Sequence, residues 1–167
     1  MAVDYNFPFA GGNVGLFYNA TYTLRINSTP VALIPERVNL FRGVHANPEY
    51  AHVARVTYQR GPVSGSLRWR HEGPTQDSRI ENVFVGIERV GTDPAALPKP
   101  FIGAWNLLDL AFTFDVSERL TFNIGVNNLT DAQPPILGSV AGEQANTNPN
   151  FFNPLGRQFF TGITLRM

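Results

Sequence analysis

The stretch from residue 106 to residue 127, NLLDLAFTFDVSERLTFNIGVN, decides the fold because it alternates apolar and polar residues on both sides of a short turn. Before the turn, the large apolar residues occupy even positions: Leu108, Leu110, Phe112, Phe114 and Val116. After the turn they again occupy even positions: Leu120, Phe122, Ile124 and Val126. Successive residues of a strand point to opposite faces. This period of two therefore predicts an antiparallel hairpin with one apolar and one polar face, joined by the three-residue turn 117–119.

The same alternation recurs along the rest of the chain. It predicts further strands over residues 3–9, 14–26, 50–60, 63–72 and 155–167. Gly61 and Pro62 suit a two-residue type II′ turn, because glycine accepts the positive φ of the first position and proline the negative φ of the second. The chain is therefore all-β, with about seven antiparallel strands.

The connections between these strands differ in length in a regular way. Short turns at 10–13, 61–62 and 117–119 alternate with long connections at 28–47, 74–103 and 130–154. Residues 83–87, inside the second long connection, are a candidate strand extension. Short turns at one end and long loops at the other are typical of outer-membrane β-barrels. The sequence therefore predicts an antiparallel up-and-down transmembrane β-barrel segment.

Composition excludes several classes of protein. Thirteen Lys and Arg balance thirteen Asp and Glu, which disfavours a nucleic-acid binder that depends on phosphate contacts. The chain has no cysteine, which excludes a disulfide framework, a thiolate metal site and a cysteine nucleophile. No apolar run approaches the roughly 18 residues that a transmembrane helix needs.

Charge placement favours a membrane orientation for the strands. Away from the strand ends, the apolar sets carry no charged residue, whereas the opposite sets carry several: Arg25, Arg55, Arg68, Arg70, Glu72, Asp109, Asp115 and Arg166. This distribution fits an apolar face against lipid and a polar face toward a wet lumen. A soluble sheet with one solvated face remains an alternative.

Two segments near the C-terminal end resemble TonB-dependent outer-membrane receptors. The segment FNIGVNNLTD at 122–131, followed by Pro134 and Pro135, is similar to the penultimate strand and its loop in that family. The segment NPLGRQFF at 153–160 is similar to the start of the closing strand. Residues 48–50, 58–61 and 66–70 resemble an upstream hairpin of the same barrels.

The resemblance implies a barrel of about 22 strands around a plug. Such receptors import scarce cargo such as ferric siderophores, vitamin B12 or carbohydrates. We expect residues 1–167 to be the C-terminal part of such a barrel, with the plug domain absent and the sheet open. The expected partners are the lipid bilayer of the bacterial outer membrane and the barrel-insertion machinery, which reads the C-terminal strand. Met167 stands where that strand usually ends in phenylalanine. TonB-type energy coupling would act only through the missing plug.

The resemblance also marks the residues of the family signature. They are Asn127, Asn128, Leu129, Thr130, Asp131, Pro154, Leu155, Gly156, Arg157, Phe159 and Phe160. Four arginines are candidates for lumen-facing contacts with cargo or with a plug: Arg25, Arg55, Arg68 and Arg70. The competing interpretation, which the notional charge balance favours, is a structural network with Glu72, Asp109 and Asp115.

Nothing in the sequence predicts catalysis, a cofactor or a metal. Ser64 and Ser66 lie on the opposite strand face from His71, so a serine-histidine pair is not expected. His52 and His71 should pair across the hairpin as rim residues, with metal binding the weaker alternative. Two other proteins would fit the pattern: a self-standing small outer-membrane barrel with a structural or adhesive role, or a soluble β-barrel binding protein.

Overall fold

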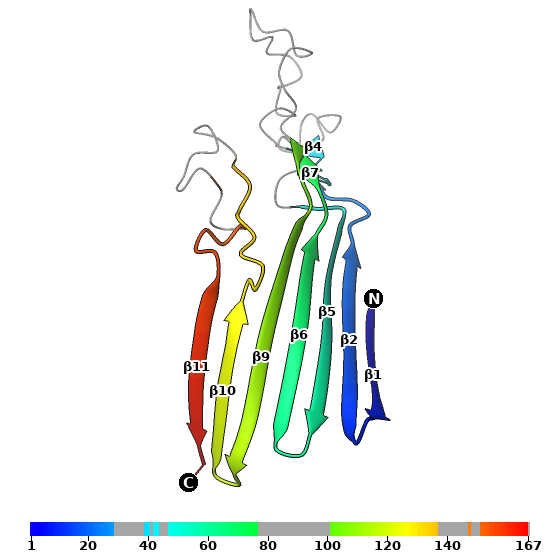
Figure 1. The fold of residues 1–167 in the computed structure, drawn as a ribbon. Coiled ribbons are helices and arrows are strands. Elements are labelled where there is room, and N and C mark those ends of the chain that lie inside the picture. The colour runs from blue at the N-terminus through cyan, green and yellow to red at the C-terminus, as the bar shows by residue number, and fades with distance from the viewer. Residues whose placement is uncertain are drawn as a thin grey trace, which may run out of the picture.

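The computed structural model describes residues 1–28, 39–40, 42–43, 47–76, 101–136, 147 and 151–166. Within these residues, seven long strands form one antiparallel sheet in the order β1-β2-β5-β6-β9-β10-β11. The strands are β1 (Ala2–Phe9), β2 (Gly12–Tyr22), β5 (Tyr50–Arg60), β6 (Val63–Glu72), β9 (Trp105–Ser117), β10 (Leu120–Asn127) and β11 (Gln158–Leu165). Figure 1 shows that each long strand lies beside its neighbour in the chain.

Two short strand pairs extend the end of the sheet from which the long connections leave. β3 (Asn27–Ser28) pairs with β4 (Asn39–Leu40), and β7 (Thr75–Gln76) pairs with β8 (Phe101–Ile102). The short turns lie at the opposite end, as predicted (Figure 1). Residues 83–87, the candidate strand extension, lie outside the described residues.

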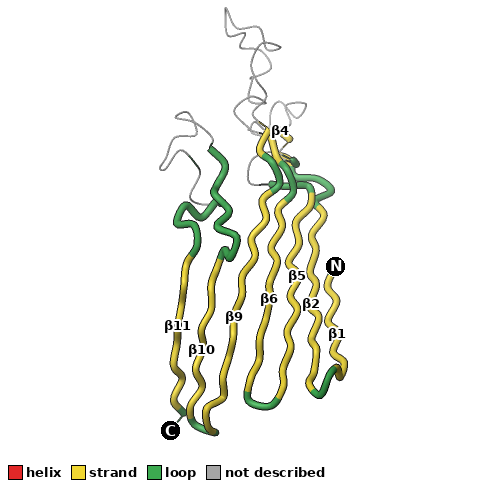
Figure 2. Tube along the Cα trace, viewed as in Figure 1, coloured by secondary structure: helices red, strands yellow, loops and turns green. Residues whose placement is uncertain are grey.

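The sheet is open. β1 pairs only with β2 and β11 pairs only with β10, so each has one free edge along its described length. Figure 2 shows these two strands at opposite margins of a single curved layer. The all-β, seven-stranded, antiparallel and open arrangement is therefore confirmed.

The alternation places the two residue sets on the two faces as predicted. One register row crosses all seven strands on the apolar face: Tyr5, Leu16, Val56, Leu67, Leu110, Val126 and Phe159. We call this side the apolar face. The other side, which holds Arg55, Arg68 and Asp109 in one row, is the polar face.

The turns differ slightly from the sequence prediction. Phe9 pairs with Gly12, so the first turn contains only Ala10 and Gly11, both with positive φ (49° and 77°). The turn predicted at 117–119 contains only residues 118–119, and the register shifts before Thr121, which pairs with Asp115. This bulge supplies the odd residue, so the even apolar sets still face each other. Gly61 has the expected positive φ of 57°.

Two strands are shorter than the alternation predicts. β2 ends at Tyr22 rather than at residue 26, because its partner β5 begins at Tyr50, directly opposite. β11 begins at Gln158 rather than at residue 155, because β10 ends at the opposite residue, Asn127. Alternation continues beyond these points in the sequence, but a strand extends only as far as a neighbour can accept its backbone hydrogen bonds.

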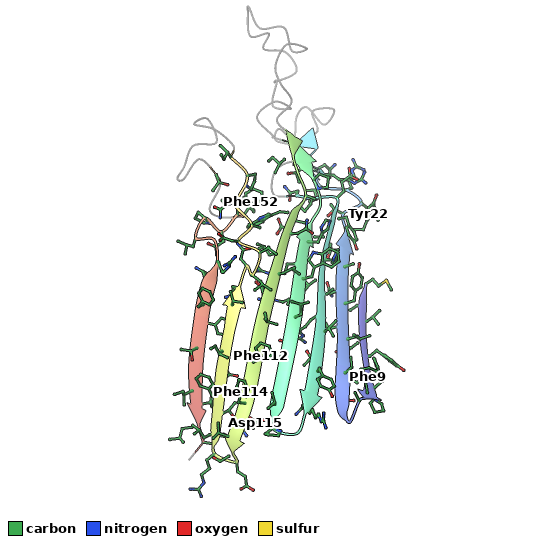
Figure 3. The ribbon with its side chains drawn as sticks, viewed as in Figure 1. Phe9, Tyr22, Phe112, Phe114, Asp115 and Phe152 are labelled. Atoms are coloured by element: carbon green, nitrogen blue, oxygen red, sulfur yellow. The ribbon has the colours of Figure 1, made fainter. Side chains whose placement is uncertain are left out.

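A single layer leaves little interior. Among the described residues, the buried apolar side chains are Ile102, Leu107, Val126 and Phe152. Most other large apolar side chains of the apolar face are partly or fully exposed, including Phe112 along β9 (Figure 3). The described residues contain no helix of sufficient length and hydropathy to span a membrane.

Candidate functional site

The polar face is organised around Asp109, near the middle of β9. Its carboxylate accepts hydrogen bonds from Arg68 Nε at 2.9 Å and from Arg70 Nε and Nη2 at 3.0 and 3.1 Å. The backbone N–H of Asn128 donates a fourth bond at 2.9 Å. The side chain of Asp109 is only 7% exposed. Buried carboxylates require such partners, so this arrangement holds both guanidiniums against the wall.

Arg55 lies on the same register row but is held differently. It is directly opposite Arg68 and stands over the ring of Phe17, with its guanidinium carbon 5.3 Å from the ring centroid. The structure thus places three of the four predicted arginines, Arg55, Arg68 and Arg70, together on the polar face. Of the acidic partners in the competing interpretation, only Asp109 forms ion pairs with them among the described residues.

Arg25 is the exception. It lies in residues 23–26, which form no strand, so the alternation of β2 does not determine the face on which it lies. Its prediction as a lumen-facing strand residue rested on a strand that continued to residue 26, and that extension is wrong.

The two signature segments meet at the top of β10 and β11. Asn128 caps its own loop, because its side chain donates to Ala132 O at 2.9 Å and accepts from Ala132 N at 2.8 Å. Asp131 Oδ1 accepts from the N–H of Arg157 at 2.8 Å. Gly156 has a φ of +66°, and a Cβ there would lie 2.8 Å from the same Asp131 oxygen. This loop geometry explains why the segment needs glycine and short polar side chains.

The remaining signature residues have simpler positions. Asn127 ends β10 opposite Gln158, and Leu129 N–H donates to Leu108 O at 2.6 Å. Thr130, Pro154 and Leu155 are exposed in the loops. Phe159 lies on the apolar face at the free edge, while Phe160 packs on the polar face above Gly125, which leaves room for its ring.

An aromatic cluster lies on the apolar face near the end with the long connections. His52 and His71 pair across the hairpin as predicted, with their rings stacked 4.8 Å apart. Trp69 Nε1 donates to Asn106 Oδ1 at 3.0 Å, and the His71 Nδ1 atom lies 2.8 Å from the same oxygen. The Tyr18 and Tyr50 hydroxyls are hydrogen-bonded to each other. We call these residues the rim cluster. His45 lies outside the described residues, and the described residues contain no group of three metal-ligating side chains.

A small cavity opens on the polar face at the same end. It has a volume of about 100 Å³, and its lining includes Arg70, Glu72, Trp105 and Phe151. Phe152, from the connection before β11, packs edge-on against Trp105 with centroids 4.9 Å apart (Figure 3). Sequence reasoning missed both aromatic residues. Trp105 precedes the alternating run, and Phe152 lies inside a connection with no period.

Comparison with solved structures finds the same fold in siderophore receptors. The ferric enterobactin receptor of Pseudomonas aeruginosa, in complex with enterobactin, matches with a TM-score of 0.60 and 18% identity over 98% of this chain and 22% of that one. The siderophore receptor of Acinetobacter baumannii matches with a TM-score of 0.54 and 16% identity over 97% of this chain and 21% of that one.

These matches establish the class of fold. The chain has the fold of a segment of a siderophore-receptor β-barrel, as the sequence resemblance implied, and it spans about a fifth of the length of those receptors. No family model and no curated protein sequence matches the chain.

Proposed function

We propose that this chain forms part of the barrel wall of a bacterial outer-membrane receptor that takes up a ferric siderophore. The observation that carries the proposal is the match of nearly the whole chain to siderophore-receptor barrels. In this proposal the apolar face contacts lipid, the polar face lines the lumen, and the wall acts as a scaffold and contact surface without catalysis.

The apolar face supports this orientation. Large side chains in the middle of the strands are exposed, for example Val56 at 47% and Ile124 at 44%. A continuous exposed apolar surface of this kind marks a contact with lipid or protein. From Val63 to His71, β6 spans about 26 Å at about 3.3 Å per residue, close to the height of the apolar band of an outer-membrane barrel once strand tilt is included.

The rim cluster supports the same orientation. Tyrosine, tryptophan and histidine carry polar atoms on apolar rings, and outer-membrane barrels concentrate aromatic residues at both lipid–water interfaces. Tyr18, Trp69 and His71 lie on the apolar face near the end with the long connections. This end is therefore the extracellular one in our proposal.

The free edges of β1 and β11 argue against the two alternatives. A self-standing small barrel or a soluble β-barrel would close its sheet, because unpaired edge groups are costly in lipid and promote aggregation in water. Here the two edge strands do not pair with each other. We propose that further strands and a plug complete the receptor, and that TonB-dependent energy coupling acts through that plug.

The test follows the gene product that contains this chain in its own host under iron limitation. We expect the protein in the outer-membrane fraction, and we expect deletion of its gene to reduce uptake of one iron-loaded siderophore, with restoration by the intact gene. Recovery of the protein in a soluble fraction would contradict the proposal, as would unchanged uptake across a panel of ferric siderophores.

A further inference from the structure

The polar face places like charges directly opposite each other. Arg55 on β5 and Arg68 on β6 are register partners on adjacent antiparallel strands. Side chains in such pairs have Cβ atoms about 5 Å apart, and like charges at this separation destabilise a sheet. Arg70 adds a third guanidinium two residues along the same face of β6.

The nearby carboxylates do not balance this charge. Asp109 is the closest, and it is shared between Arg68 and Arg70. Glu72 is two residues beyond Arg70 on β6, on the side away from Arg55. Asp4 shares the row of Arg55 but is two strands away, about 10 Å at the usual strand spacing. Asp115 accepts a hydrogen bond from Thr121 at the far end of β9. The positive excess is therefore centred on Arg55 and Arg68.

Both arginines have hydrogen-bond donors to spare. Arg68 donates to Asp109 through Nε alone, so its two terminal amino groups have no partner within the described part of the chain. Arg55 has only its contact with the Phe17 ring among the same residues. The side chain of Arg68 is 44% exposed, so its free donors are accessible from the polar face.

Asp109 makes Arg68 a prepared binding group. A guanidinium that is already oriented by a carboxylate loses less conformational freedom when it binds a ligand. The stacking of Arg55 on Phe17 restrains the second guanidinium in the same way. Planar guanidiniums bind carboxylate and phosphate groups through paired N–H donors.

We propose that Arg55 and Arg68 form an oxyanion-binding site on the polar face, with Arg70 adding electrostatic attraction. Its ligand is a carboxylate or phosphate group, carried either by a small anion in the lumen or by acidic side chains of a protein segment that fills it. This inference goes beyond the proposed function, which would hold for a wall that binds no anion. It rests on that function only for the access of water to the polar face.

The experiment measures anion binding by the full chain folded in detergent micelles, which cover the apolar face. Isothermal titration at low salt uses two probes, inorganic pyrophosphate and a hexaglutamate peptide. The variants are Arg55→Gln and Arg68→Gln. The control is Arg60→Gln, which removes the same charge from the short-turn end of β5 on the apolar face. Circular dichroism confirms equal strand content before each titration.

We expect either variant to weaken binding about tenfold, the usual range for the loss of one charged hydrogen-bonding partner, and the control to change it less than about twofold. Tighter binding of pyrophosphate would identify a small anion as the ligand, and tighter binding of the peptide would identify a protein segment. The proposal is wrong if the folded chain binds neither probe, or if the control weakens binding as much as the two variants. Outer-membrane recovery of the protein would be unaffected by either result, so the proposed function is tested separately.

Discussion

The two faces of the sheet differ in what holds their side chains in place. On the polar face, one buried carboxylate, Asp109, fixes Arg68 and Arg70 through hydrogen bonds and ion pairs. On the apolar face, the middle of each strand carries side chains such as Leu67 and Ile124 that remain substantially exposed and lack polar contacts. Residues one position apart on the same strand therefore depend on different surroundings. The polar face is stabilised from within the chain, and the apolar face needs an apolar solvent.

The largest test of this difference removes the solvent. Without detergent or lipid, the 167-residue chain should aggregate, because its apolar face and both free edges are exposed to water. Sedimentation after dilution from denaturant should place nearly all of the protein in the pellet, and detergent micelles should keep it in solution. A monodisperse monomer in buffer would contradict the assignment of the apolar face to lipid.

The second test places the same charge on each face. Replacement of Ile124 by arginine should destabilise the barrel by about 2–4 kcal/mol, because the charge would face the middle of the bilayer. Asn123→Arg, one residue away on the polar face, should cost much less, although it removes the bond from Thr113 Oγ1. The measurement is urea unfolding in phospholipid vesicles of the protein that carries this segment. Equal losses for the two variants would reverse or abolish the distinction between the faces.

The third test concerns the centre of the polar face. Asp109→Asn should lower the free energy of unfolding by about 1–3 kcal/mol, because two guanidiniums lose their anionic partner while the site stays the same size. Asp115→Asn is the matched control, since Asp115 is exposed and accepts only from Thr121 among the described residues. Its expected effect is below about 0.5 kcal/mol. The comparison uses the same vesicle unfolding assay, and an equal effect at both positions would show that Asp109 does not organise this face.

The smallest expected effect comes from a single methyl group. A Cβ at Gly125 would meet the ring of Phe160 and would lie 2.6 Å from the backbone oxygen of Leu110. Gly125→Ala should therefore cost about 1–2 kcal/mol through overpacking. At Gly162, on the neighbouring strand and the same face, a Cβ would meet nothing within 4 Å. Gly162→Ala should leave the unfolding midpoint nearly unchanged, and a greater loss there than at Gly125 would exclude close packing of Phe160 as the cause.

The sequence by itself determined the strands and their faces. Alternation is a local property, because each residue's direction follows from that of its neighbour. The run from Leu108 to Val126 was therefore sufficient to predict a hairpin, its apolar side and the pairing that keeps the even positions together. The pairing of His52 with His71 followed in the same way, since a two-residue turn at Gly61 and Pro62 sets the register of both strands.

Only the tertiary structure decided where the strands end and which distant residues meet. β2 ends at Tyr22 because its partner ends there, and no property of residues 23–26 reveals that limit. The bond from Asn128 to Asp109 and the bond from Arg157 to Asp131 join residues 19 and 26 positions apart. Such contacts depend on how neighbouring strands place their loops in space. A period of two specifies which face a residue occupies, but it carries no information about the loop that will lie beside it.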